Sequence, residues 1–201
     1  MIEIHLREHS TQNAGYGFDK YFDLDNYTSA DEIIQELMEH TKEMINENNL
    51  DIKNFNLEEW LITDLEIDSD YLNCNDIGFD EHMSIDKLLK INEDLKEDNY
   101  FNEDMDLITK LYMGAFGGDI EEALEKVNEG DLSIIEFEEF SLKNKYQLLG
   151  EYFVEYSEDY GLDIPDHIKS YIDTEKYGRD LGMDFIVSTF KNGKVYAIRN
   201  Y

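Results

Sequence analysis

The residues near the start of the chain that could perform chemistry are two histidines and a glutamate. Residues 5–9 read HLREH, which fits the H-x-x-E-H pattern of one class of zinc metalloprotease. That chemistry needs both histidines on one face of a helix, whereas the apolar residues in 2–9 alternate as they do in a strand. The pattern therefore predicts a surface strand and no zinc site.

No other spacing in the sequence indicates a catalytic or cofactor site. There is no glycine-rich phosphate loop and no G-x-S-x-G elbow, and the single cysteine, Cys74, can form neither an internal disulfide nor a cysteine-based zinc cluster. Residues 125–136 have the outline of a calcium loop, but Val127 stands where a ligand is required. We therefore expect no catalytic residue, no metal and no cofactor. A hydrolase with paired carboxylates is a third hypothesis only, because among 48 acidic residues such a pair is not specific.

The acidic residues themselves form the clearest pattern. Between Ser29 and Asn48 they recur every three or four residues, which places them on one stripe of a helix, opposite an apolar face. The stripe consists of Glu32, Glu36, Glu39, Glu43 and Glu47. Like charges at this spacing cost about 0.2–0.5 kcal/mol per pair. Solubility explains such a stripe simply, and a binding surface explains it functionally, because roughly one carboxylate per 4.5–6 Å approaches the ~3.4 Å phosphate spacing of a DNA strand.

The composition indicates a folded and strongly acidic protein. The chain has 201 residues, of which 48 are Asp or Glu and 17 are Lys or Arg, for a formal net charge of −31. A disordered acidic tail would hold fewer than its 41% hydrophobic and 13% aromatic residues. Direct binding to nucleic acid or to an anionic membrane is disfavoured, because phosphate contacts need lysine and arginine. No stretch approaches the ~18 apolar residues of a membrane helix and no signal segment is evident, so we expect a soluble, cytoplasmic protein with a basic partner.

Charge is distributed unevenly along the chain. Residues 1–66 carry 16 acidic and 4 basic side chains, residues 67–140 carry 22 and 5, and residues 141–201 carry 10 and 8. Two bodies as acidic as the first 140 residues would repel each other. The nearly neutral last part is therefore the expected surface of a homodimer.

The elements that must position the carboxylates form three blocks, and the fold class that they predict is α+β. In residues 1–66 we expect two strands joined by a glycine-containing turn, a helix opened by Ser29 and Glu32 as a capping box, and a third strand near 57–65. This combination predicts a small α+β domain.

The second block, residues 67–130, is expected to be a helical domain. Ser84 is the expected cap of a helix over 85–96, and a second helix covers 103–115. Asp119 with Glu122 opens a third helix, which ends near Gly130.

The third block, residues 131–201, is expected to be a second α+β domain. A strand at 132–140 precedes a helix that Ser141 caps and that runs to about residue 159. Two short helices at 166–171 and 173–181 follow, and Asn192-Gly193 turns a closing hairpin of 185–190 and 194–200.

Several segments follow the pattern of a known family. Residues 171–185, YIDTEKYGRDLGMDF, combine Tyr-Ile-Asp with Gly-Arg-Asp-Leu, and residues 146–156, YQLLGEYFVEY, place Leu-Gly-x-Tyr in an amphipathic helix. The first resembles the closing segment of the ArdA antirestriction proteins, and the second resembles their antirestriction motif. Three further segments resemble the family in the same order along the chain, namely residues 58–66, 82–95 and 163–173.

The resemblance implies a shape and a mode of action. It implies an elongated chain of three small domains that dimerises through the third, bends like B-form DNA and occupies the DNA groove of Type I restriction and modification enzymes. On this reading the carboxylates that stand in for DNA phosphates are Glu32, Glu36, Glu39, Glu43, Glu47, Asp64, Glu66, Asp68, Asp70, Asp86, Glu93, Asp94, Glu121, Glu122 and Glu125. The residues expected in the antirestriction motif and at the dimer interface are Tyr146, Leu148, Leu149, Gly150, Tyr152 and Val154.

We therefore interpret the chain as a non-catalytic antirestriction protein. It is expected to bind the specificity and methyltransferase core of a Type I enzyme in competition with DNA. The alternative is an acidic DNA-mimic module for another basic target, such as a CRISPR effector or a nucleoid or transcription protein.

Overall fold

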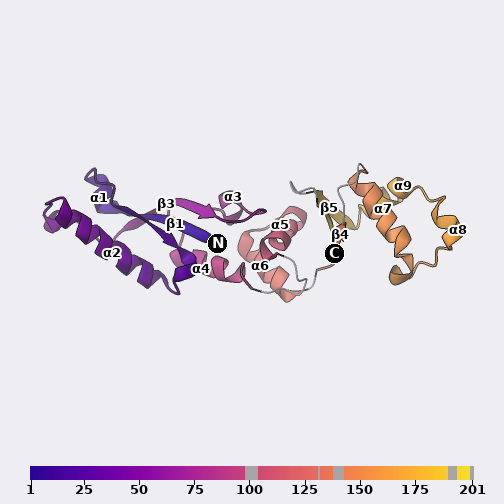
Figure 1. The fold of residues 1–201 in the computed structure, drawn as a ribbon, viewed down its shortest axis with the longest axis horizontal. Helices are drawn as coiled ribbons and strands as arrows, with labels where there is room; N and C mark the ends of the chain where they lie inside the picture. Colours follow the sequence, from indigo (N-terminus) through magenta and orange to yellow (C-terminus); the bar gives the residue numbers. More distant parts are fainter. Residues whose placement is uncertain (98–103, 131, 138–142, 190–193, 200–201) are drawn as a thin grey trace.

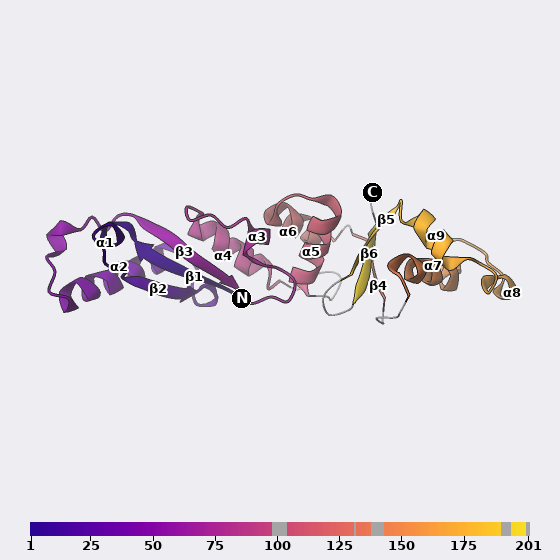
Figure 2. The ribbon, with the colours of Figure 1, turned by 90° about the horizontal axis from the view of Figure 1, so that it is seen from above.

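The computed structural model describes residues 1–97, 104–130, 132–137, 143–189 and 194–199. In this part of the chain there are nine α-helices and two antiparallel sheets of three strands each, which confirms the α+β fold class. The molecule is elongated, and its elements follow one another along the long axis roughly in chain order (Figures 1 and 2). The first sheet and the longest helix lie at one end, and the helices of the last block lie at the other.

The first sheet and its helix build the N-terminal end. The strand order is β2 (Asp19–Asp23), β1 (Ile2–Glu8), β3 (Trp60–Ile67), and α2 (Ala30–Glu47) packs on the sheet. Alternation in β1 buries Ile2, Ile4 and Leu6, and the stripe that α2 turns toward them includes Ile33 and Leu37. Two short 3-10 helices, Leu24–Asn26 and Ile52–Asn54, flank α2 along the chain.

A β-bulge explains why the apolar residues of β3 do not alternate strictly. Leu6 pairs with Ile62 while His5 pairs with Asp64, so that Thr63 is an extra residue on the β3 side. Ile62 and Leu65 are three positions apart, and the bulge turns both toward the core.

Local sequence signals located most helices but not all of their ends. The Asp119 carboxylate accepts a hydrogen bond from the Glu122 amide, and Gly130, at φ 71°, ends the helix in the left-handed conformation, as predicted. Ser29 does cap α2, but the Glu32 carboxylate bonds to the Thr28 amide and not to Ser29, so the expected capping box is incomplete. Ser84 precedes its helix without a side-chain capping bond.

Three helices differ from the prediction. One of them, α3 (Cys74–Ile77), lies in a stretch for which no helix was predicted. A short helix, α1 (His9–Asn13), lies in the expected turn between the first two strands, because the Glu8 carboxylate accepts bonds from the Ser10 and Thr11 amides. The helix of the antirestriction-like segment begins at Lys145 and is capped by Asn144, whose side chain accepts from two amides; it ends at Glu155, before the 3-10 helix Ser157–Tyr160. Ser141, the predicted cap, lies outside the described residues.

The remaining helices and strands complete the middle and the C-terminal end. The middle contains α3 (Cys74–Ile77), α4 (Ile85–Asp94), α5 (Met105–Phe116) and α6 (Ile120–Glu129). The C-terminal end contains β4 (Ile134–Phe137), α7 (Lys145–Glu155), α8 (Asp166–Lys169), α9 (Thr174–Leu181), β5 (Phe185–Thr189) and β6 (Val195–Arg199), with the sheet order β4, β6, β5. The turn of the predicted closing hairpin, Asn192-Gly193, falls outside the described residues.

The apolar side chains gather into two main cores and one small cluster. The larger core joins the first sheet and α2 to the middle helices. Its members run from Ile2 to Val127, so residues 1–66 and residues 67–130 share this core. The second core lies between α7 and the C-terminal sheet. Tyr196 of β6 is fully buried against Leu107 and Leu111 of α5, so this small cluster connects the second sheet to the middle.

A charge network around Asp25 ties α4 to the first sheet. The Asp25 carboxylate accepts from Lys96 Nζ at 2.5 Å, from Asn92 Nδ2 at 2.9 Å and from the N-terminal ammonium of Met1 at 3.0 Å. Asn92 is itself buried, and its Oδ1 accepts from the Ile2 amide at 2.9 Å. The bond from Lys96, followed by those from Asn92 and the N-terminus, lowers the pKa of Asp25 far below its ordinary value although partial burial opposes the shift.

Replacing Asp25→Asn should lower the free energy of unfolding at pH 7 by up to about 1 kcal/mol, because Lys96 and the N-terminal ammonium lose their anionic partner and solvent screens these partly exposed charges. The folded-state pKa lies below the unfolded one, so this stabilisation is present above about pH 4 and declines as the pH falls further. Urea denaturation at pH 7 and pH 3 should show a gap between wild type and variant that narrows in acid. The exposed Asp163→Asn is the matched control, and an equal gap at both pH values would contradict the network.

Helices α7 and α9 touch backbone to backbone. A β-carbon on Gly150 would lie 1.9 Å from the carbonyl oxygen of Thr174, and one on Gly178 would lie 1.7 Å from that of Tyr146. Both positions therefore admit only glycine. The two glycines belong to the two segments with the closest likeness to the family, which gives a packing reason for glycine at each.

Gly150→Ala or Gly178→Ala should destabilise the C-terminal end by more than the about 1–3 kcal/mol of ordinary overpacking, because the clash is with backbone atoms that cannot rotate away. Thermal unfolding followed by circular dichroism measures this. Gly114→Ala in α5 is the control: nothing lies within 4 Å of its added carbon, so it should stabilise by about 0.5–1 kcal/mol. If Gly150→Ala unfolded at the same midpoint temperature as wild type, the close contact would be disproved.

Candidate functional site: the acidic surface

The glutamates of α2 lie on the side of the helix opposite its buried residues. Glu39, Glu43 and Glu47 are exposed, and among the described residues none of them forms an ion pair with lysine or arginine. Gln35, which lies one turn before Glu39 in the helix, donates a hydrogen bond to the Glu39 carboxylate. These three carboxylates therefore present uncompensated negative charge to the solvent.

The two glutamates nearer the start of α2 have structural partners. Glu32 is exposed, and its carboxylate accepts from the Thr28 amide before the helix. Glu36 is half-buried and bridges two elements, with Lys20 Nζ at 2.6 Å and the Tyr27 hydroxyl at 2.9 Å. The bond from Lys20 lowers the pKa of Glu36, while burial and Glu36 raise the pKa of Tyr27 to about 12. Glu36 thus attaches α2 to β2 and contributes little free charge.

A second group of predicted carboxylates follows β3 and the loop after it. Asp64, Glu66, Asp68 and Asp70 are all exposed. The strand pairing adds two residues that the sequence analysis missed: Glu3 lies opposite Asp23 on one side and opposite Glu66 on the other, so three carboxylates cross the outer face of the sheet in one row. Alternation in β1 placed Glu3 on the outer face, but only the strand order reveals the row.

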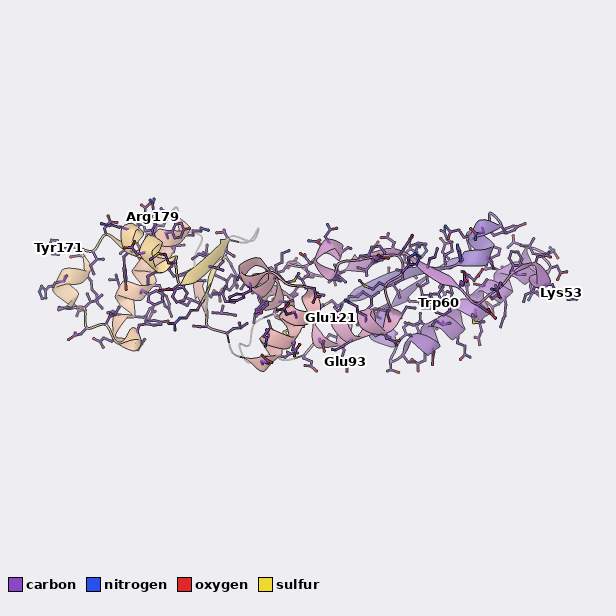
Figure 3. All side chains as sticks on the ribbon, turned by 180° about the vertical axis from the view of Figure 1, so that it is seen from behind. Lys53, Trp60, Glu93, Glu121, Tyr171 and Arg179 are labelled. Atoms are coloured by element: carbon purple, nitrogen blue, oxygen red, sulfur yellow. The ribbon has the colours of Figure 1, made fainter. Side chains whose placement is uncertain are left out.

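The third group lies on the middle helices. Asp86 and Glu93 of α4 and Glu122 and Glu125 of α6 are exposed. Figure 3 shows Glu93 and Glu121 on neighbouring helices in the middle of the molecule. The half-buried members behave differently: Glu121 pairs with Lys87 at 2.6 Å, and desolvation raises the pKa of Asp94.

Several of the paired lysines join one element to another. The pairs are Lys20–Glu36 at 2.6 Å, Lys87–Glu121 at 2.6 Å, Lys96–Asp25 at 2.5 Å and Lys110–Asp76 at 2.5 Å. Each of these lysines neutralises a carboxylate where two elements meet, and two of the four carboxylates, Glu36 and Glu121, are predicted phosphate mimics. The outward carboxylates consequently form a polyanionic surface along the first two blocks, which attracts basic partners.

The histidines of the H-x-x-E-H string do not converge on a metal position. His5 lies in β1, where its ring stacks on Tyr21 at a centroid distance of 4.0 Å, and Glu8 caps α1. Among the described residues no group of three His, Cys, Asp or Glu side chains is arranged to hold a metal ion. None of the described helices is both long and apolar enough to cross a membrane.

Comparison with known families decides the kinship of the chain. The family model described as Antirestriction protein (ArdA) matches residues 9–196, which is nearly the whole chain. The chain belongs to the ArdA family. Membership implies an antirestriction function directed at restriction–modification enzymes, and ArdA proteins are inhibitors and not catalysts. A search of curated proteins finds no match.

The antirestriction-like segment of this ArdA chain forms α7, and its side chains pack mainly within the C-terminal end. Leu149, Gly150 and Val154 are buried, while Tyr146, Leu148 and Tyr152 are half-buried. Burial, together with a hydrogen bond to Tyr160, raises the pKa of Tyr152 to about 12. Beyond α7 the surface is apolar in places, with large exposed side chains at Tyr156, Tyr160, Leu162, Ile168, Tyr171 and Met183.

Charge neutralisation should separate the structural from the free glutamates of α2. The triple variant Glu39→Gln, Glu43→Gln, Glu47→Gln should unfold at a slightly higher urea concentration, because two like-charge pairs worth about 0.2–0.5 kcal/mol each disappear. Glu36→Gln should instead lower the free energy of unfolding by up to about 1 kcal/mol, because the ion pair with Lys20 is lost. If both variants shifted in the same direction, the distinction between the two kinds of glutamate would be wrong.

Proposed function

We propose that this ArdA-family chain inhibits a Type I restriction–modification enzyme by occupying its DNA-binding cleft as a mimic of DNA. One observation carries the proposal: in the described part of the chain, exposed carboxylates without lysine or arginine partners recur along α2, β3, α4 and α6 of an elongated body, while Lys20, Lys87 and Lys110 pair with carboxylates where elements meet. A cleft that binds DNA phosphates with lysine and arginine suits such a surface.

The mechanism is electrostatic competition without chemical turnover. Carboxylates take the positions of phosphates, and the enzyme core of specificity and methyltransferase subunits binds the inhibitor in place of the duplex. The contributing carboxylates are those exposed in the first two blocks, with Glu36, Asp94 and Glu121 in supporting positions. Since an exposed charge contributes only about 0.2–1 kcal/mol, the binding energy is spread over many side chains.

The proposed active form is a homodimer of elongated chains. Residues 1–66, 67–130 and 131–201 are the three proposed domains, of which the first two share one core. The third forms the two-fold interface, because it is nearly neutral and carries the exposed apolar side chains. One chain has a net charge of −31, so a dimer has −62. At ~1.7 Å per charge, 62 charges correspond to roughly 105 Å or about 31 base pairs of duplex. This length suits a long bipartite DNA cleft in a cytoplasmic enzyme.

Displacement of DNA from a Type I methyltransferase core tests the proposal. The purified chain should release labelled DNA at near-stoichiometric amounts, with two chains per core, and less effectively as salt rises. Glu39→Gln, Glu43→Gln, Glu47→Gln should weaken displacement between about threefold and a hundredfold. The charge-matched control Glu155→Gln, Glu158→Gln, Asp163→Asn alters the near-neutral third block and should leave displacement unchanged.

Three results would count against the proposal. Failure of the wild-type chain to displace DNA would favour another basic DNA-binding target, such as a CRISPR effector or a nucleoid or transcription protein. Equal losses from the two charge-matched variants would show that net charge alone matters. Turnover of a substrate that one single carboxylate substitution abolishes would indicate an enzyme.

A further inference from the structure

A groove of about 500 Å³ opens at the start of β3, and no residue of α2 lines it. It is lined by His9, by residues 58–62 and by residues 81–83. Trp60, the one tryptophan of the chain, forms part of this lining and is 36% exposed. A tryptophan left this open in a groove offers an aromatic surface that the cores of the molecule do not use.

Backbone hydrogen bonds hold both sides of the groove in place. The His9 amide donates to the Glu59 carbonyl at 2.9 Å, which fixes the residue before Trp60 against α1. The Ile62 amide donates to the Glu81 carbonyl at 3.2 Å, which fixes the 81–83 segment against the free edge of β3. The groove is therefore formed without a ligand, and binding would require little ordering of the chain.

Three carboxylates surround the aromatic surface. Glu58, Glu59 and Glu81 are exposed and line the groove. Among the described residues Glu59 and Glu81 pair only with histidines, His9 at 3.0 Å and His82 at 3.5 Å. Lysines neutralise carboxylates elsewhere in the molecule, but in the described part of the chain neither lysine nor arginine lines this groove.

This combination selects one kind of side chain. A guanidinium group is planar and weakly hydrated, stacks on an indole, and donates paired hydrogen bonds to a carboxylate. An ammonium group is compact and strongly hydrated, and it gains less from the aromatic face. We propose that the Trp60 groove binds an arginine side chain of the partner protein.

The proposal rests on the proposed function in one respect, namely that the arginine belongs to the DNA-binding cleft of the restriction enzyme. The groove supplies what the carboxylate stripes lack. Stripes of exposed charge steer a basic cleft toward the inhibitor, and each single exposed charge contributes only about 0.2–1 kcal/mol. An arginine seated between Trp60 and the surrounding carboxylates sets the register of the inhibitor in the cleft.

Nuclear magnetic resonance tests the groove without any enzyme, because Trp60 gives the one indole N–H signal of the full chain. Titration with Nα-acetyl-arginine amide should shift this signal with a dissociation constant at least about threefold lower than that for Nα-acetyl-lysine amide. Glu58→Gln, Glu59→Gln, Glu81→Gln should weaken arginine binding at least about fivefold, and the charge-matched Glu39→Gln, Glu43→Gln, Glu47→Gln should not. An unmoved indole signal, or equal affinities for the two amides, would overturn the proposal.

The enzyme assay then identifies the source of the arginine. Trp60→Ala should weaken DNA displacement from the methyltransferase core by about threefold to thirtyfold. Its control is Phe116→Ala at the end of α5, an aromatic residue that is also 36% exposed, lies outside the proposed dimer interface and does not line the groove. If the amide binds the groove while Trp60→Ala displaces DNA as well as wild type does, the assignment to the enzyme cleft is wrong. If wild type displaces no DNA, the proposed function fails, and the amide titration alone judges the groove.

Discussion

Mutual repulsion among carboxylates is the constraint that the rest of this structure has to satisfy. A chain with 48 acidic and 17 basic residues cannot neutralise its surface. Its few basic side chains therefore stabilise the structure most where two elements meet. Lys20, Lys87 and Lys96 each join an element to its neighbour through a carboxylate. The elongated arrangement in Figure 1 also keeps the outward charges further apart than a sphere would.

Apolar packing and charge therefore occupy separate parts of the same elements. On α2 the residues at Ile33 and Leu37 enter the larger core while Glu39 and Glu43 face solvent. The C-terminal end differs, because apolar side chains are found both inside and on its surface. Its antirestriction-like helix contributes Leu149 and Val154 to the interior, and exposed apolar side chains lie nearby. The two ends thus present different surfaces, one strongly acidic and one partly apolar.

The sequence predicted those features that depend on neighbouring residues. The periodicity of α2, the Asp119 cap and the Gly130 end were all local signals, and each was confirmed. The bulge at Thr63 and the row through Glu3 depend on which strands pair, and no local pattern encodes this pairing. Periodicity likewise placed Glu36 on the acidic stripe, but its partners Lys20 and Tyr27 come from residues 9 to 16 positions away and became visible only in the folded chain.

The close contact of Gly150 with Gly178 has an evolutionary consequence. Under the proposed mechanism many charges each contribute weakly, so selection on any single carboxylate is weak and acidic positions can change between Asp, Glu and neighbouring sites while the total is kept. A backbone contact at 1.7–1.9 Å from any added carbon tolerates no such exchange. Relatives of this chain should then diverge quickly over the acidic surface and retain glycine at the helix crossing.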